Sequence, residues 1–178
     1  MADRLTGDPP SPFVRQWAAT LAPTLPPRRR ALDLAMGRGR HARVLCGLGL
    51  VTFGVDWNFE AVRSAVAELA AQGQQLRGWC ANLTVSSLPR AAFELILVTR
   101  YLQRDLMPSI GEAVVPGGVV IYETFTVNQR ALGTGPTSPH HLLEPGELAD
   151  CFKGFEIHCS EEVSAPEAVA RLVARKPA

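Results

Sequence analysis

The chain has 178 residues and a mass of 19.2 kDa, which is the size of one domain. Hydrophobic residues make up 47% and charged residues 20%, a composition typical of globular proteins that excludes wholesale disorder. The formal net charge is +1, which argues against a protein that binds nucleic acid through a global basic field.

No apolar run reaches the roughly 18 residues that a membrane span requires, and the N-terminus lacks the apolar core of a secretory signal. The four cysteines form no C-x-x-C pair, so their spacing predicts neither a zinc site nor a redox motif. We therefore expect a cytoplasmic protein with free thiols and no membrane contact. Residues 1–11 are polar and proline-rich and are expected to form a mobile tail, with residues 12–178 forming one domain.

Helical spacing of apolar residues predicts a first helix over residues 13–21, ended by Pro23. From residue 31 onward, strand and helix patterns alternate. Apolar runs predict seven strands, at 31–35, 51–56, 75–82, 93–99, 118–124, 155–161 and 168–175. Helical patterns predict helices at 41–48, after Asn58 as N-cap, at 106–115 and at 147–152, and a long loop covers 126–143.

Strands that alternate with helical crossovers predict an α/β fold of the Rossmann-like type, with a mostly parallel seven-stranded sheet and helices on both faces. The last two strands are separated by only a few residues and predict a hairpin, which adds one antiparallel edge strand. In such a sheet the binding site is expected at the carboxyl ends of the strands, where the strand order reverses.

Gly37 and Gly39 lie between the first strand and the helix that follows it. Glycine permits a tight turn there and lets a ligand lie against the backbone, while the helix N-terminus offers unpaired N–H groups. Residues 37–42 also satisfy the G-x-G-x-x-G/A dinucleotide fingerprint. A plain strand–turn–helix connection without a ligand is the alternative interpretation of the same residues.

Two carboxylates accompany this glycine loop. Asp56 ends the second strand, where it can accept both hydroxyls of a ribose or cap the next helix. Asp33 lies within the first apolar strand, and burial of a carboxylate costs several kcal/mol unless the group is paired. This position favours a ligand with an ammonium or sulfonium group over one with a pyrophosphate.

Taken together, the glycine loop with Asp33, the acid at Asp56 and the Val115-Pro116-Gly117-Gly118 turn resemble class I S-adenosylmethionine-dependent methyltransferases. The stretches VTRYLQR (98–104), PGGVVIYETF (116–125) and LLEPGEL (142–148) are similar to a small bacterial subgroup related to tellurite-resistance and thiopurine-type methyltransferases. The resemblance covers residues 31–175. It implies S-adenosyl-L-methionine as cofactor and methyl transfer to a small-molecule acceptor by in-line displacement.

The resemblance also implies roles for individual residues. The first motif would cradle the methionine half of the cofactor, Asp56 would bind its ribose, and Trp57 would pack on the adenine. Asn82 stands where the family has an aspartate that accepts from the adenine amino group, so a weaker contact is expected. The implied cofactor site comprises Asp33, Ala35, Gly37, Gly39, Arg40, Asp56, Trp57, Asn82, Leu83 and Thr99, with His41 next to Arg40 near the methionine carboxylate.

Methyl transfer to an acceptor needs chiefly alignment and exclusion of water, and proximity alone can supply ~7–11 kcal/mol. No fixed triad is therefore expected. Tyr101, Arg104 and Glu123 are the predicted catalytic candidates because they lie at strand ends, and Glu123 alternatively pairs with an arginine such as Arg100. The adjacent His140 and His141 lack the spacing of a metal pair, so no metal is predicted and the 126–143 loop is a candidate lid.

Two other functions remain open from the residues. The GRGRHA stretch (37–42) is compatible with an NAD(P)-dependent oxidoreductase. A non-catalytic, cofactor-binding module is compatible with Asn82 and with the short chain. The sequence argues for a small-molecule acceptor over nucleic acid. The arginines near the mouth of the site, Arg100, Arg104 and Arg130, are an alternative indication of an anionic acceptor. Both a monomer and a homodimer are compatible with the sequence.

Overall fold

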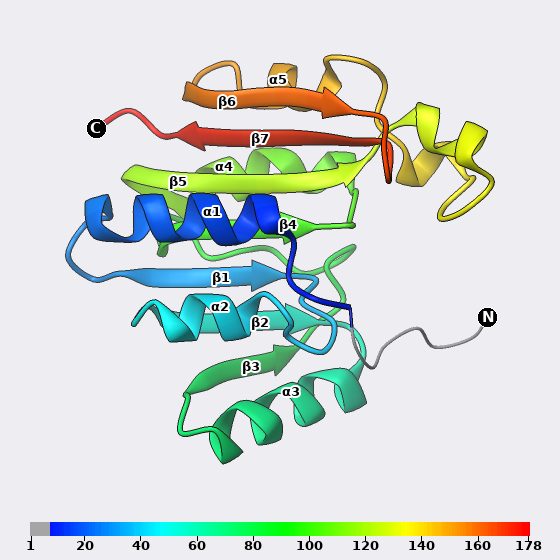
Figure 1. The fold of residues 1–178 in the computed structure, drawn as a ribbon. Helices are drawn as coiled ribbons and strands as arrows, with labels where there is room; N and C mark the ends of the chain where they lie inside the picture. The colour runs from blue at the N-terminus through cyan, green and yellow to red at the C-terminus, as the bar shows by residue number, and fades with distance from the viewer. Residues whose placement is uncertain (1–7) are drawn as a thin grey trace.

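The computed structural model describes residues 8–178, so residues 1–7 of the expected tail lie outside the described residues. One seven-stranded sheet has the order β3-β2-β1-β4-β5-β7-β6 (Figure 1). Strand β7 is antiparallel to both of its neighbours, and the other strands all run in one direction. The strands are β1 (Arg30–Leu34), β2 (Val51–Asp56), β3 (Leu76–Cys80), β4 (Phe93–Thr99), β5 (Val114–Phe125), β6 (Glu156–Val163) and β7 (Val169–Arg175).

Helices cover both faces of the sheet. In Figure 1, α1 and α2 lie in front of the sheet, and α4 and α5 lie behind it. The bounds are α1 (Pro12–Leu21), α2 (Ala42–Gly47), α3 (Phe59–Ala71), α4 (Met107–Ala113) and α5 (Glu147–Cys151). The predicted Rossmann-like α/β class is confirmed. Among residues 8–178, no helix combines the length and apolarity that a bilayer crossing demands.

The antiparallel strand lies one place in from the edge of the sheet, whereas the sequence predicts it at the edge. Strand β7 pairs with β5 on one side and with β6 on the other. Its residues are almost all buried, while β6 is exposed along most of its length. The apolar strand therefore occupies the interior position, and the polar strand forms the edge. Polar side chains suit an edge strand because it is exposed to water.

The Pro116-Gly117-Gly118 segment lies within β5, although a turn before the strand was predicted. The preceding helix ends at Ala113, and the pairing with β4 shifts register between Phe93 and Leu95 to accommodate the extra residues. A side chain at Gly118 would lie 2.9 Å from the Val115 carbonyl oxygen, so this close backbone approach requires glycine.

The predicted long loop contains two short 3₁₀ helices, Val127–Leu132 and Pro139–His141. Buried Gln129 holds this loop in place. Its Oε1 accepts the Ala168 N–H at 2.7 Å, and its Nε2 donates to the Thr134 carbonyl oxygen at 2.9 Å. The loop is thereby fixed to the start of β7.

The alternation of side-chain direction along β1 determines where the Asp33 carboxylate lies. Leu32 and Leu34 pack in the cluster that includes the α4 and α5 side chains, while Ala31 packs with the α1 side chains on the opposite face. Because successive strand residues point to opposite faces, Asp33 shares the face of Ala31. The carboxylate is thus buried beneath the helices that precede and follow β1.

The Met36 side chain of the glycine loop fills space that exists only because residue 54 is glycine. A Cβ at Gly54 would lie 2.1 Å from the Met36 Sδ. We expect Gly54→Ala to destabilise the protein by about 1–3 kcal/mol through overpacking. Met36→Ala alone should cost about 2–5 kcal/mol through the cavity it leaves.

Urea denaturation of both single variants and the double variant measures the coupling. The loss in free energy of unfolding of the double variant should be smaller than the sum of the two single losses by about 1 kcal/mol or more. Each change removes the clash or the cavity that the other makes. Strictly additive effects would contradict the proposed contact. Gly154→Ala is a matched control, since a Cβ there meets no atom within 4 Å and Gly154 does not have a left-handed φ.

Candidate functional site

Two adjacent cavities lie at the carboxyl ends of the parallel strands. Their volumes are about 970 Å³ and about 420 Å³, within the range of small-molecule sites. Ala35 and Arg100 line both cavities and form their common wall. The larger cavity is bounded by the glycine loop, residues 8–10, Phe125, residues 134–136 and Glu167, and the smaller by Asp56, Trp57, residues 81–84 and Tyr101.

The glycine loop opens its backbone to the larger cavity. Gly37 has φ +55°, and a Cβ there would meet no atom within 4 Å. Gly39, at φ +73°, serves packing instead, because its Cβ would lie 3.1 Å from the Ala65 Cβ on α3. Ala35 adopts φ +54°, a left-handed conformation that strains any residue except glycine. The loop thus combines a bare backbone with a strained residue at the junction of the cavities.

Asp56 joins the glycine loop to α3. Its Oδ2 accepts the Gly37 N–H at 2.8 Å, and its Oδ1 accepts the Asn58 N–H at 2.9 Å. The Asn58 side chain caps α3 by accepting the Ala61 N–H, as the sequence predicts. A carboxylate has about four acceptor positions. Asp56 therefore retains acceptor capacity toward the smaller cavity while its backbone contacts hold the loop.

Asn82 uses its side-chain oxygen within its own turn. The Asn82 Oδ1 accepts the Thr84 N–H at 3.0 Å and the Thr84 hydroxyl at 2.8 Å. These two donors occupy the carbonyl oxygen, and the amide NH₂ remains as a donor toward the smaller cavity that Asn82 lines. Asn82 therefore presents to the smaller cavity an uncharged side chain whose oxygen already accepts two hydrogen bonds.

Asp33 is fully buried, and neither of its oxygens has a hydrogen-bond partner. The Ala42 backbone N–H lies near enough to lower the Asp33 pKa without completing a hydrogen bond. Burial raises the pKa of Asp33 to about 7, against smaller lowering effects from Ala42 and the Arg40 charge. The residue lines neither cavity, so its effect on a ligand is that of a nearby charge rather than of a direct contact.

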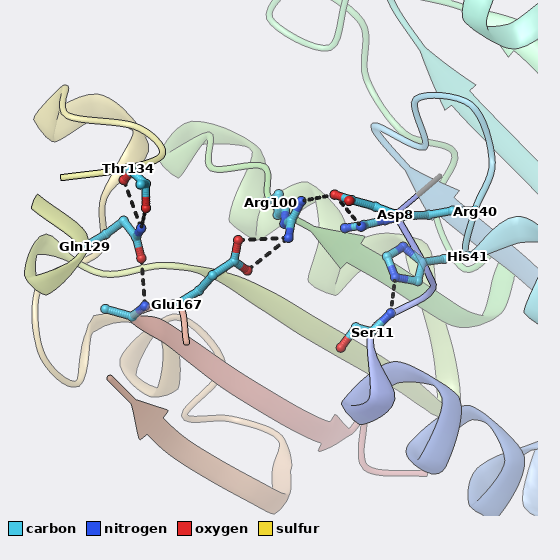
Figure 2. A network of polar contacts seen from close by, with 9 residues as sticks. Asp8, Ser11, Arg40, His41, Arg100, Gln129, Thr134 and Glu167 are labelled. Carbon is cyan, nitrogen blue, oxygen red and sulfur yellow. Dashed lines mark hydrogen bonds and ion pairs between the residues drawn. The ribbon is translucent and has the colours of Figure 1, made fainter. Parts of the chain in front are cut away.

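His41 fastens the segment before α1 to the end of β4. The Ser11 N–H donates to the His41 Nε2 at 3.0 Å (Figure 2). The His41 Nδ1 lies 3.1 Å from the Thr99 hydroxyl. Since Nε2 accepts, the neutral ring carries its proton on Nδ1 and donates to Thr99. Burial and the charges of Arg40 and Arg100 lower the His41 pKa to about 3. Both ring nitrogens are thus engaged, and His41 does not offer a donor to a ligand carboxylate.

The structure brings most of the implied cofactor residues together. Those that line a cavity are Ala35, Gly37, Arg40, Asp56, Trp57, Asn82, Leu83 and Thr99. Asp33 and Gly39 support the loop from beneath without lining either cavity. The Trp57 side chain is 79% exposed, so the smaller cavity has an aromatic wall whose outer face is open to water.

The catalytic candidates are not brought together. Tyr101 lines the smaller cavity, beside Asp56 and Asn82, and its hydroxyl donates to the Gln103 Oε1. Glu123 lines neither cavity and pairs with Arg171 at 2.7 Å, so the alternative of an arginine partner is the one observed, with Arg171 in place of Arg100. An internal ion pair of this kind positions β5 against β7.

Arg104 also lies outside both cavities. It contacts both carboxylate oxygens of Glu147 and donates to the Leu142 carbonyl oxygen at 2.9 Å, and its guanidinium lowers the pKa of Glu147. Arg104 therefore ties the 126–143 loop to α5. Within residues 8–178, no three His, Cys, Asp or Glu side chains gather closely enough to hold a metal ion.

Sequence reasoning missed the polar network at the mouth of the larger cavity. Arg100 donates to Asp8 and to both oxygens of Glu167 (Figure 2). These partners are 92 and 67 residues away in sequence, so local patterns carry no signal for the contacts. Of these three residues the sequence indicates Arg100 alone, from its place at the end of a predicted strand.

Comparisons with known proteins agree on the fold. TehB from Haemophilus influenzae superimposes with a TM-score of 0.74 at 15% identity, over 90% of this chain and 62% of that chain. An S-adenosylmethionine-dependent methyltransferase from Clostridium acetobutylicum matches with a TM-score of 0.73 at 14% identity, over 99% and 96% of the two chains. The [4+2]-cyclase SpnF matches with a TM-score of 0.71 at 15% identity, over 97% and 85%.

The chain spans 62% of the TehB structure that it matches. It has the fold shared by class I S-adenosylmethionine-dependent methyltransferases. The expected resemblance is thereby confirmed at the level of the fold. No protein-family model matches the sequence, and no curated protein matches it. Because SpnF is named a cyclase, the fold alone does not fix the reaction.

The unpartnered Asp33 makes stability depend on pH. Its folded pKa lies above its unfolded value, so the folded state binds more protons between these values and stability falls as pH rises from about 4 to about 7. The rise from 3.8 to about 7 corresponds to at most roughly 4 kcal/mol. Asp33→Asn removes this titration.

Between pH 4 and pH 8 we expect the parent protein to lose stability that Asp33→Asn does not lose. The free energy of unfolding of the variant, relative to that of the parent, should therefore be about 2–4 kcal/mol higher at pH 8 than at pH 4. Urea denaturation at both pH values measures it. The comparison across pH cancels the cost of burying the amide itself. A pH-independent difference would show that Asp33 is already paired in the folded protein.

Proposed function

We propose that the protein is an S-adenosyl-L-methionine-dependent methyltransferase that acts on a small molecule. The observation that carries the proposal is the pair of cavities joined at Ala35, with the bare glycine loop in one and Asp56 in the other. This arrangement suits a ligand with an amino-acid half and a nucleoside half.

The residues fit this cofactor in three respects. The exposed backbone at Gly37 leaves open space for the methionine half. Asp56 keeps acceptor capacity for ribose hydroxyls. The buried, unpartnered Asp33 provides a negative charge beneath the loop, and a sulfonium or ammonium above it would favour the ionised carboxylate. Arg40, on the larger cavity, is the proposed partner of the methionine carboxylate.

When bound, the cofactor supplies a methyl group on a sulfonium whose departure leaves a neutral thioether. The chain's own residues align and shield that methyl group. Residues 8–10 and 134–136 bound the larger cavity and would restrict water, while the strained Ala35 and Arg100 define the junction at which donor and acceptor would meet. Tyr101 is the one predicted catalytic candidate that remains at a cavity.

Two features count against an NAD(P)-dependent oxidoreductase. The antiparallel β7 lies between β5 and β6, whereas the dinucleotide-binding fold has the parallel order 3-2-1-4-5-6. Asp33 would also place a negative charge beneath a pyrophosphate. A non-catalytic module remains the alternative that experiment must separate. The four cysteines are unpaired, which supports a cytoplasmic location as part of the same proposal.

Calorimetry with S-adenosylmethionine, S-adenosylhomocysteine and NADH tests the proposal. We expect the first two compounds to bind and NADH not to bind. Because a sulfonium favours ionised Asp33, S-adenosylmethionine should bind more tightly at pH 8 than at pH 6, with proton release at the lower pH. Absence of S-adenosylmethionine binding at millimolar concentration would exclude the function. Binding without methyl transfer to any of a panel of small acceptors would favour the non-catalytic module.

Asn82→Asp should strengthen cofactor binding. One carboxylate oxygen can hold Thr84 as the amide oxygen does now, and the second becomes a charged acceptor toward the smaller cavity. We expect about a 3- to 10-fold lower dissociation constant for S-adenosylhomocysteine by calorimetry. The exposed Asn128→Asp is the matched control and should change nothing. Weaker binding in Asn82→Asp would show that the adenine does not contact this side chain.

A further inference from the structure

Two arginines from different elements meet at one carboxylate in the larger cavity. The Asp8 Oδ2 lies 3.2 Å from the Arg100 Nη1 and 3.7 Å from the Arg40 Nη1 (Figure 2). Burial and the neighbouring Arg100 charge both lower the pKa of Arg40. Two cations held this close favour an anion between them, and in the free protein the chain's own Asp8 provides it.

Asp8 holds this place loosely. Its side chain is 54% exposed, and a single oxygen serves both arginines. Both carboxylate oxygens of Glu167 accept from the Arg100 Nη2, at 2.9 and 3.0 Å, so Glu167 makes two close contacts where Asp8 makes one. Glu167 therefore orients the Arg100 guanidinium, and Asp8 is the partner that an incoming anion could replace.

Arg100 also has partners on the side of the cavity away from the glycine loop. Its guanidinium lies 5.9 Å from the centre of the Phe125 ring, and Glu167 belongs to the connection between β6 and β7. Arg40 belongs to the glycine loop itself. In the proposed function Arg40 serves the cofactor, which leaves Arg100 for the acceptor.

Arg100 also occupies a costly backbone conformation. Its φ of +51° is left-handed, which is unfavourable for a residue with a long side chain. The Arg100 N–H donates to the Glu123 carbonyl oxygen at 2.9 Å and so fixes this conformation at the end of β4. The strained residue lies on the wall common to both cavities, where a reacting group would have to lie.

We propose that the acceptor is an anion, a carboxylate or phosphate, whose charged group binds Arg100 in the place that Asp8 now occupies. This inference rests on the proposed methyltransferase function. Binding of the acceptor would detach Asp8, while the Ser11–His41 hydrogen bond keeps the rest of the segment on the protein. The methionine carboxylate of the cofactor is the other anion that would suit Arg100. The experiment below distinguishes binding of that carboxylate from binding of the acceptor.

The experiment titrates three anionic probes, acetate, benzoate and inorganic phosphate, against the neutral acetamide and benzamide. NMR chemical shifts report binding to the protein alone and to the protein loaded with S-adenosylhomocysteine. We expect at least one anion to bind more tightly than its neutral counterparts. Asp8→Asn should raise that affinity about 3- to 10-fold by removing the competing carboxylate, and Arg100→Gln should lower it at least about 10-fold.

Asp150→Asn and Arg90→Gln make the same charge changes outside both cavities and should leave anion binding unchanged. The affinity for S-adenosylhomocysteine should change less than about 3-fold in Arg100→Gln. Anions that bind no better than the neutral probes, or no effect of Asp8→Asn, would overturn the inference. Equal loss of S-adenosylhomocysteine and anion binding in Arg100→Gln would also overturn it, because Arg100 would then serve the cofactor.

Failure of S-adenosylhomocysteine to bind the parent protein counts against the proposed function alone. The anion titrations of the unloaded protein do not depend on it, so the two failures are distinguishable.

Discussion

The Asp56 carboxylate is the contact on which the geometry of the site depends. It accepts one N–H from the glycine loop and one from the start of α3, and so joins two segments that follow neighbouring strands. A second tie supports it, because the Met36 N–H donates to the Val55 carbonyl oxygen at 3.0 Å. The bend of the loop, the open backbone at Gly37 and the wall of the smaller cavity all depend on the position of this one side chain.

Packing beneath the loop sets the second constraint. The Met36 side chain requires glycine at residue 54, and Gly39 lies against Ala65. The loop is therefore held from below by close contacts and from the side by Asp56, which leaves its upper backbone free for a ligand. Rigid support of this kind positions a binding surface more accurately than a mobile loop does.

The sequence predicts the strands and helices well because burial on both faces leaves continuous apolar runs, as in β4, whose bounds agree with the prediction. It also predicts the glycine loop, Asp56 and the Asn58 cap, since each of these acts within a few residues of a recognisable pattern. Glu123 and Arg104 were assigned to the acceptor side because they lie near strand ends, yet Arg171 and Glu147 engage them. Such partners are 48 and 43 residues distant, and only the folded chain brings them together.

Several charged residues near the glycine loop lie where they lower the stability of the folded protein. Asp33 is buried without a partner, Arg40 lies beside Arg100, and Arg100 itself has a strained backbone. Each feature costs free energy in the isolated protein, and burial of an unpaired carboxylate costs the most. A cation above Asp33 would stabilise its ionised form, and a ligand anion in the place of Asp8 would keep both arginines paired. The fold is shared with proteins of different chemistry, so the proposed ligands are argued from these charged groups and not from the sheet.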